Sequence, residues 1–78
     1  MAKKILIVDD SVSIRKSVSF VLSNEGFEVI EAEDGLDGLK KAEGQQCSLV
    51  ITDINMPNMN GIDLIKSLRQ SVAYKFTP

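Results

Sequence analysis

Short apolar runs alternate along the chain with longer segments whose apolar residues recur at helical spacing. Residues 4–9 form a nearly continuous run of Leu and β-branched residues, which predicts a strand buried on both faces of a parallel sheet. Residues 27–31 predict a second, shorter strand, and its two glutamates indicate a less buried position at a sheet edge. Residues 47–54 predict a third strand, apolar enough for a central position.

Three helices are predicted between and after these strands. Ser11 is the expected N-cap of a helix over residues 12–25, Asp34 of a helix that ends at Gly44, and Asn60 of a last helix. The residues expected to face the sheet are Ile14, Val18, Val21 and Leu22, then Leu36, Leu39 and Ala42, and finally Ile62, Ile65 and Leu68. Gly35 and Gly38 each weaken the second helix by roughly 0.8 to 1 kcal/mol relative to Ala. We therefore expect that helix to be short and comparatively mobile.

The order β-α-β-α-β-α predicts an α/β fold, a doubly wound parallel sheet with helices on both faces and right-handed crossovers. In such sheets the chemistry lies beyond the carboxyl ends of the strands. Asp9 and Asp10 follow the first predicted strand, and Asp53 lies at the end of the third. These three aspartates are the candidate functional residues.

Composition limits the classes of function. The 78 residues are 44% hydrophobic and 26% charged, which indicates one compact domain. A net charge of −2 without a basic run argues against nucleic acid or anionic lipid as a partner. No apolar run approaches the roughly 20 residues of a membrane span, and none forms a signal-peptide core, so no membrane association and a cytoplasmic location are expected.

A single cysteine and the absence of histidine exclude an internal disulfide and every histidine-based catalytic or zinc site. Cys47 is expected to be a small buried hydrophobe rather than a nucleophile, because no histidine is present to activate it. Any chemistry must therefore use carboxylates.

Neighbouring carboxylates at the sheet edge repel one another, by roughly 4 kcal/mol per pair at 4 Å and an effective dielectric constant of 20. Mg²⁺ would relieve this repulsion, because it binds one or two carboxylates with carbonyl oxygens and waters and leaves positions open for a phosphate. An aspartate beside such a metal can accept a phosphoryl group. The alternative for Asp9 and Asp10 is a purely structural role in capping the helix that follows. Asp53 is harder to explain in that way, because the surrounding run from Leu49 to Ile54 is almost wholly apolar.

Other phosphate and metal motifs are absent. Neither a P-loop nor a G-x-G-x-x-G pattern occurs. The segment from Asp53 to Asn58 begins like an EF-hand loop, but Asn58 occupies the position that requires glycine. Asp9 and the four residues after it do not match the D-x-D-x-[TV] motif of haloacid-dehalogenase phosphatases.

Three segments together resemble the receiver domain of bacterial response regulators, the chemotaxis type above all: residues 5–11, residues 32–35 and residues 50–61. The resemblance implies a flavodoxin-like fold with strand order 2-1-3-4-5, in which Asp53 accepts a phosphoryl group from the phosphohistidine of a sensor histidine kinase. It also implies that Asp10, Asp53 and the main-chain carbonyl of Asn55 hold Mg²⁺, with Asp9 acting through a metal-bound water. Such a protein is a phosphoacceptor rather than an enzyme, with at most autophosphorylation and autodephosphorylation chemistry of its own.

By the same resemblance, residues 1–78 correspond to the N-terminal two-thirds of a receiver and end where the fourth strand would begin. Two hypotheses follow. The chain is a phosphoacceptor signalling domain with impaired phosphotransfer, or it is a folding and assembly module without phosphotransfer. In either case we expect a homodimer, formed by pairing of the third strand or by exchange of elements about residues 57–61.

Overall fold

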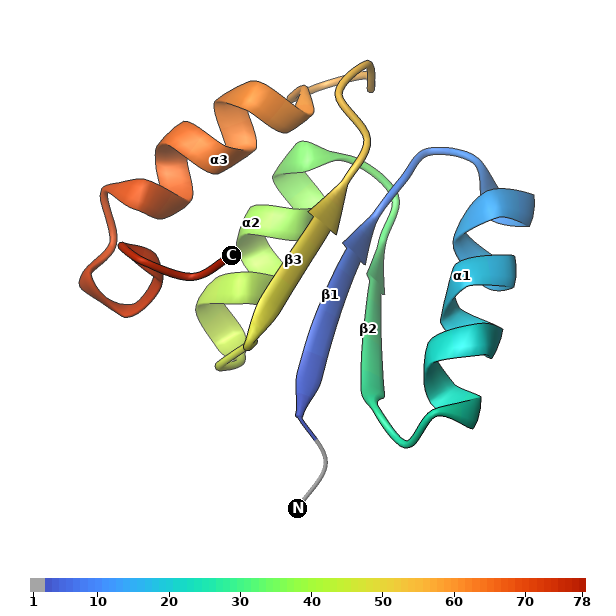
Figure 1. Ribbon diagram of the computed structural model, residues 1–78. Coiled ribbons are helices and arrows are strands. Elements are labelled where there is room, and N and C mark those ends of the chain that lie inside the picture. The colour runs from blue at the N-terminus through green and yellow to red at the C-terminus, as the bar shows by residue number, and fades with distance from the viewer. Residues whose placement is uncertain (1–2) are drawn as a thin grey trace.

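The computed structural model describes residues 3–78 and contains a sheet of three parallel strands between two layers of helices (Figure 1). The strands are β1 (Lys4–Val8), β2 (Glu28–Ala32) and β3 (Leu49–Thr52). They lie in the order β2-β1-β3. The α/β class, the parallel sheet and the strand order 2-1-3 are confirmed.

The helices are α1 (Val12–Asn24), α2 (Gly35–Gly44) and α3 (Gly61–Arg69), followed by a short 3₁₀ helix, η1 (Val72–Tyr74). α1 covers one face of the sheet, and α2 and α3 lie side by side on the other (Figure 1). The predicted caps are confirmed. The side chains of Ser11, Asp34 and Asn60 each accept a hydrogen bond from the main-chain N–H three residues later.

β1 is the central strand, and four of its five residues are buried. Leu6 lies in register with Ile30 of β2 and Val50 of β3. Because side chains alternate along a strand, Leu6 and Val8 face α2 and α3, whereas Ile5 and Ile7 face the α1 side. β1 is thus buried on both faces, as its continuous apolar run predicts.

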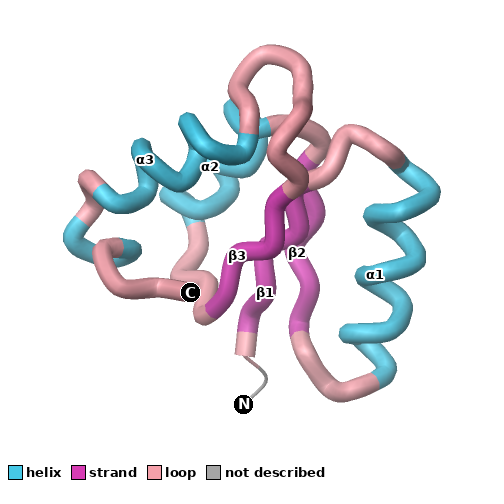
Figure 2. The backbone as a smooth tube through the Cα atoms, turned by 45° about the horizontal axis from the view of Figure 1, so that its top comes forward, coloured by secondary structure: helices cyan, strands magenta, loops and turns pink. Residues whose placement is uncertain are grey.

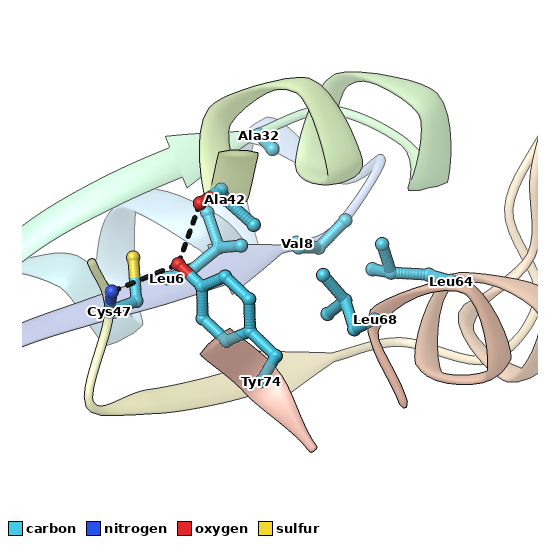
Figure 3. Packing of buried hydrophobic residues seen from close by; sticks show 8 residues of the cluster. All are labelled: Leu6, Val8, Ala32, Ala42, Cys47, Leu64, Leu68 and Tyr74. Carbon is cyan, nitrogen blue, oxygen red and sulfur yellow. Dashed lines mark hydrogen bonds between the residues drawn. The ribbon is translucent and has the colours of Figure 1, made fainter. Parts of the chain in front are cut away.

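The main hydrophobic core lies between the sheet, α2 and α3 (Figure 3). Its buried members are Leu6, Val8, Ala32, Ala42, Cys47, Leu64, Leu68 and Tyr74. Burial raises the pKa of the Cys47 thiol above its ordinary value, although a hydrogen bond with Tyr74 opposes this effect. Cys47 is 1% exposed, so it is the buried small residue that the sequence predicts.

Tyr74 inserts its ring into this core from the C-terminal segment (Figure 3). Its hydroxyl donates to the carbonyl oxygen of Ala42 at 2.6 Å and also contacts the carbonyl oxygen of Gln45. The phenol oxygen of Tyr74 also accepts a hydrogen bond from the N–H of Cys47 at 3.0 Å. One phenol group therefore holds the chain between α2 and β3 against the segment that follows α3.

The third strand differs from the prediction. It spans only Leu49–Thr52 rather than residues 47–54, and its side chains are mostly half-buried rather than buried as in a central strand. Its place at an edge of the sheet follows from the order 2-1-3. The edge is not wholly open, because the N–H of Val50 donates to the carbonyl oxygen of Pro78 at 3.0 Å. Cys47 precedes the strand and packs in the core. The apolar run is therefore longer than the strand, because it includes a core residue that is not paired in the sheet.

The predicted inner faces of the helices are also partly wrong. Three residues of α1 and α2 were expected to face the sheet but are more than half exposed, namely Ile14, Val21 and Leu36. The inner face of α3 differs as well. Leu68 is buried as expected, but Ile62 and Ile65 are 50% and 43% exposed. The residue that packs beside Leu68 is Leu64, which is fully buried. Leu64 and Leu68 are four residues apart and so lie on one side of the helix. Ile62 and Ile65 lie beside this buried side, at the neighbouring helical positions.

Candidate functional site

The three candidate aspartates lie at the carboxyl end of the sheet. Asp9 directly follows β1 and Asp53 directly follows β3, and the ends of these strands are in register at Val8 and Thr52. The N–H of Asp53 donates to the carbonyl oxygen of Val8 at 2.9 Å, which extends the pairing of the strands by one residue. In Figure 2 the loops that follow β1 and β3 lie at the same end of the sheet.

Asp9, Asp10 and Asp53 each offer a carboxylate oxygen, and these oxygens all lie within 4.8 Å of one another. Oδ1 of Asp9 accepts a hydrogen bond from the N–H of Ser11 at 2.9 Å, and Oδ1 of Asp53 accepts one from the N–H of Ile54 at 2.8 Å. Within residues 3–78, the carboxylate of Asp10 accepts no hydrogen bond. Each aspartate thus keeps at least one carboxylate oxygen that accepts no hydrogen bond from residues 3–78.

The burial of the cluster differs from the expectation for Asp53. Asp10 and Asp53 are exposed, and Asp9 is half-buried. The apolar run around Asp53 suggested a buried charge, but the strand ends at Thr52 and the aspartate emerges into the loop. Repulsion between exposed carboxylates is nearer the aqueous value of about 1 kcal/mol per pair than the value of about 4 used for partly buried pairs.

Asn55 lies two residues beyond Asp53 and is exposed in the loop before α3. The fold therefore keeps Asn55 on the same segment as the aspartate. Its role as a carbonyl ligand stays a prediction.

Arg15 is a neighbour of the cluster that the sequence did not reveal. Its guanidinium donates to the main-chain oxygen of Asp9 at 2.6 Å and to the carboxylate of Glu31 at 3.1 Å. Lys16 pairs with the other oxygen of Glu31 at 3.1 Å. Partial burial would raise the pKa of Glu31, but the hydrogen bonds from Lys16 and Arg15 outweigh it and lower the pKa. The sequence places Arg15 one helical turn after the N-cap Ser11 and so near the end of β1, which could have indicated that Arg15 lies beside the cluster. Nothing in the sequence indicated that it would bind the main-chain carbonyl group of Asp9.

No salt bridge within residues 3–78 joins a lysine or an arginine to Asp9, Asp10 or Asp53. Lys4 pairs with Glu28 at the opposite end of the sheet. The repulsion within the cluster is therefore not relieved by an ion pair with these cationic side chains. A hard divalent cation fits this donor set, which consists of oxygens and is open enough to admit waters and a phosphate.

None of the helices in residues 3–78 is long and apolar enough to cross a membrane.

The sequence model of the response regulator receiver domain family matches residues 5–76. This chain belongs to that family. The three segments that resemble receiver domains, the strand order and the acidic cluster thus all agree with this family of signalling proteins.

Individual relatives support the same conclusion. Chemotaxis protein CheY1 of Helicobacter pylori is 42% identical over 77 residues, which cover 96% of this chain and 62% of CheY1. The structure of the chemotaxis response regulator CheY4 of Vibrio cholerae superposes with a TM-score of 0.97 at 45% identity, over 100% of this chain and 65% of that chain. This chain therefore spans slightly less than two thirds of either relative.

A third relative has been solved with a ligand. The response regulator TrrA of Thermotoga maritima, in complex with Mg²⁺ and BeF, is 40% identical with a TM-score of 0.84, over 87% of this chain and 59% of that chain. The chain is thus similar both to chemotaxis regulators and to a receiver that was solved with magnesium.

Proposed function

We propose that Asp53 accepts a phosphoryl group from the phosphohistidine of a sensor histidine kinase, with Mg²⁺ held by Asp10, Asp53 and the main-chain carbonyl of Asn55 and with Asp9 acting through a metal-bound water. The observation that carries this proposal is the convergence of three carboxylates within 4.8 Å at the ends of β1 and β3. Membership of the receiver family supports the kinase as donor. In this role the chain is a signalling phosphoacceptor rather than a conventional enzyme.

The transfer uses the oxygen of Asp53 that is not held by the N–H of Ile54. This oxygen attacks phosphorus in line, so that an O–P bond forms while the P–N bond to the imidazole breaks. The imidazole nitrogen keeps the electron pair of the broken bond and takes up a proton. The hydrogen bond from Ile54 fixes the orientation of the carboxylate during the attack. Mg²⁺, when bound, neutralises charge on the carboxylates and on the phosphoryl oxygens.

The cation should bind weakly in this chain. Its ligands lie in the loops after β1 and β3, and two of the three carboxylates are exposed. Titration with Mg²⁺ followed by amide NMR should shift the signals of residues 9–11 and 52–56. A spectrum that does not change at tens of millimolar Mg²⁺ would show that the acidic cluster is not a cation site.

Phosphorylation should be slow and incomplete. Within residues 3–78, no lysine or arginine forms a salt bridge with the acidic cluster. The negative charge of the phosphoryl group would therefore lack a cationic side chain to stabilise it. Incubation with acetyl phosphate and Mg²⁺ followed by intact mass measurement tests this expectation. The adduct should be absent in Asp53→Asn and present in the control Asp63→Asn, which alters an exposed aspartate of α3. A rate equal to that of CheY4 under the same conditions would refute the expected impairment.

A second role, as an assembly module, is favoured by the apolar residues that the fold leaves exposed. On α1, the exposed apolar residues are Val12, Ile14, Phe20 and Val21, with exposed fractions between 56% and 68%. On β3, Ile51 is 40% exposed. We infer from these residues that two copies of the chain associate as a homodimer, which does not depend on phosphotransfer.

A further inference from the structure

In the loop between β3 and α3, residues 53–60, one main-chain hydrogen bond joins the two ends to each other and another joins the loop to α2. The N–H of Gly61 donates to the carbonyl oxygen of Ile54 at 2.9 Å. The N–H of Gly35, at the start of α2, donates to the carbonyl oxygen of Met59, also at 2.9 Å. A Cβ at Gly61 would overlap the carbonyl oxygen of Asp53, so the backbone approaches too closely for any side chain at that position.

A side-chain hydrogen bond also joins the loop to α2. The amide Nδ2 of Asn58 donates to Oδ2 of Asp34 at 2.6 Å. The other oxygen of Asp34 caps α2 by accepting from the N–H of Asp37 at 2.8 Å. Asp34 is only 7% exposed, and both of its oxygens are used. Asn58 itself has a backbone φ of +67°, a conformation that asparagine tolerates better than most residues.

The helix to which the loop is bonded is packed against the core. α2 packs against β1 and α3, and at Gly38 it approaches the side chains of Val8 and Leu64 closely. A loop bonded to the N-terminus of such a helix loses conformational freedom before any ligand binds. Binding by a restricted loop costs less ordering entropy than binding by a free one.

We propose that Asn58 and Asp34 are positioning residues for the cation site, because their hydrogen bond holds the loop that carries Asn55 beside the acidic cluster. The proposal rests on the proposed function, in which the carbonyl of Asn55 is a ligand of Mg²⁺. Neither residue touches the cation. They act by restricting the loop between Asp53 and Gly61, and they tie the geometry of the site to α2.

Two single variants remove the bond from either side. Asn58→Gly removes the amide while leaving a residue that adopts positive φ without strain. Asp34→Ser removes the acceptor while keeping a good N-cap for α2. Each variant should raise the dissociation constant of Mg²⁺ roughly tenfold, near the low end of the effect of lost supporting contacts around metal ligands. The double variant should bind no more weakly than either single variant, since both remove the same bond.

A swap of the two residues provides the rescue. In the variant Asp34→Asn with Asn58→Asp, the amide placed at position 34 can donate to the carboxylate placed at position 58, and the amide oxygen can still cap α2. The net charge is unchanged, so the swap should restore the wild-type dissociation constant. A role in stability alone would change the melting temperature without this pattern of loss and rescue in Mg²⁺ affinity.

Hydrogen exchange at the N–H of Gly61 reports the loop directly and without metal. Exchange should accelerate in both single variants and slow again in the swap. Single variants that bind Mg²⁺ as tightly as the wild type, or that leave Gly61 equally protected, would overturn the positioning role while leaving the metal site intact. If the wild type itself shows no response to Mg²⁺, the metal site proposed above is wrong, and the positioning role fails with it.

Discussion

At the scale of single residues, the hydroxyl of Tyr74 joins segments that are far apart in the sequence. It contacts the carbonyl oxygens of Ala42 and Gln45 at the end of α2 and the N–H of Cys47 before β3. Tyr74 is 3% exposed, so solvent cannot replace these hydrogen bonds. Burial raises the pKa of Tyr74, and the phenol therefore remains a neutral donor and acceptor at physiological pH.

Tyr74→Phe should lower the free energy of unfolding by about 1 to 3 kcal/mol, because it removes the hydrogen-bond acceptor of the buried N–H of Cys47. Urea denaturation followed by circular dichroism measures the change. The control Phe76→Leu alters a side chain that is 87% exposed and should have little effect. Equal stability of wild type and Tyr74→Phe would show that other partners replace the phenol.

Sequence reasoning found the aspartates but not the residues that organise them. Asp9, Asp10 and Asp53 were recognisable because each follows an apolar run that ends a strand. Tyr74, by contrast, lies in no periodic pattern, and its partners are main-chain atoms about 30 residues earlier. The bond between Asn58 and Asp34 was missed for the same reason, since a tie between two loops leaves no periodic signal.

At the scale of elements, α2 shows how packing overrides propensity. Gly38 was expected only to weaken the helix. The structure gives it a role, because a Cβ at this position would lie 2.9 Å from Cγ2 of Val8 and 3.3 Å from Cδ2 of Leu64. The glycine allows α2 to lie close to both β1 and α3. The cap at Asp34 and the spacing of apolar residues therefore located the helix, but propensity could not explain why it contains Gly38.

Gly38→Ala should lower the free energy of unfolding by about 1 to 3 kcal/mol through overpacking, in spite of the roughly 1 kcal/mol gained in helix propensity. Gly44→Ala is the matched control in the same helix. A Cβ at Gly44 meets no atom within 4 Å, so this change should be neutral or stabilising. Thermal denaturation of the two variants compares them directly, and a Gly38→Ala protein more stable than the wild type would contradict the packing argument.

The cap of α2 also predicts a dependence on pH. The N–H of Asp37 and then the amide of Asn58 stabilise the ionised carboxylate of Asp34 and lower its pKa below the ordinary value of 3.8. Because the folded-state pKa is lowered, the stabilisation is complete above the ordinary pKa. It is lost as the pH falls through the lowered value.

The difference in unfolding free energy between wild type and Asp34→Asn should therefore be largest near neutral pH and should shrink below a pH of about 4. Asn at this position still caps the helix, which isolates the effect of charge. Urea denaturation between pH 3 and pH 7 measures the difference. A difference that stays constant over this range would show that the carboxylate gains nothing from its two donors.

At the scale of the whole molecule, the sheet is covered unevenly. The layers were predictable because strands alternate with helices and the first strand is continuously apolar. The strand order followed only from the resemblance to receiver domains. The length of β3 was not predictable, because nothing in an apolar run shows at which residue the pairing with the neighbouring strand ends. Ile51 lies in register with Ile7 and so shares its face of the sheet, yet Ile51 is 40% exposed while Ile7 is 2% exposed. α1 therefore leaves part of its side of the sheet uncovered.

This uncovered part, together with Ile14 and Val21 of α1, is the surface through which we expect a second copy to bind. Exchange of elements about residues 57–61 is less favoured by the structure, because the bonds of Met59 and Gly61 would have to break. Pairing of β3 edges must compete with the hydrogen bond between Val50 and Pro78. Association through side chains breaks neither set of bonds.

Light scattering across a dilution series should show a dimer that dissociates at low concentration. Ile51→Lys should shift dissociation to higher concentrations, because a charge would replace an apolar contact on the uncovered side of the sheet. Ile62→Lys is the control, since Ile62 is 50% exposed but belongs to α3 on the opposite face. If both variants dimerise like the wild type, the contact lies elsewhere and main-chain pairing of β3 becomes the explanation to test. A folded monomer at every concentration would exclude the dimer altogether, because the exposed apolar residues would then be tolerated in water without a partner.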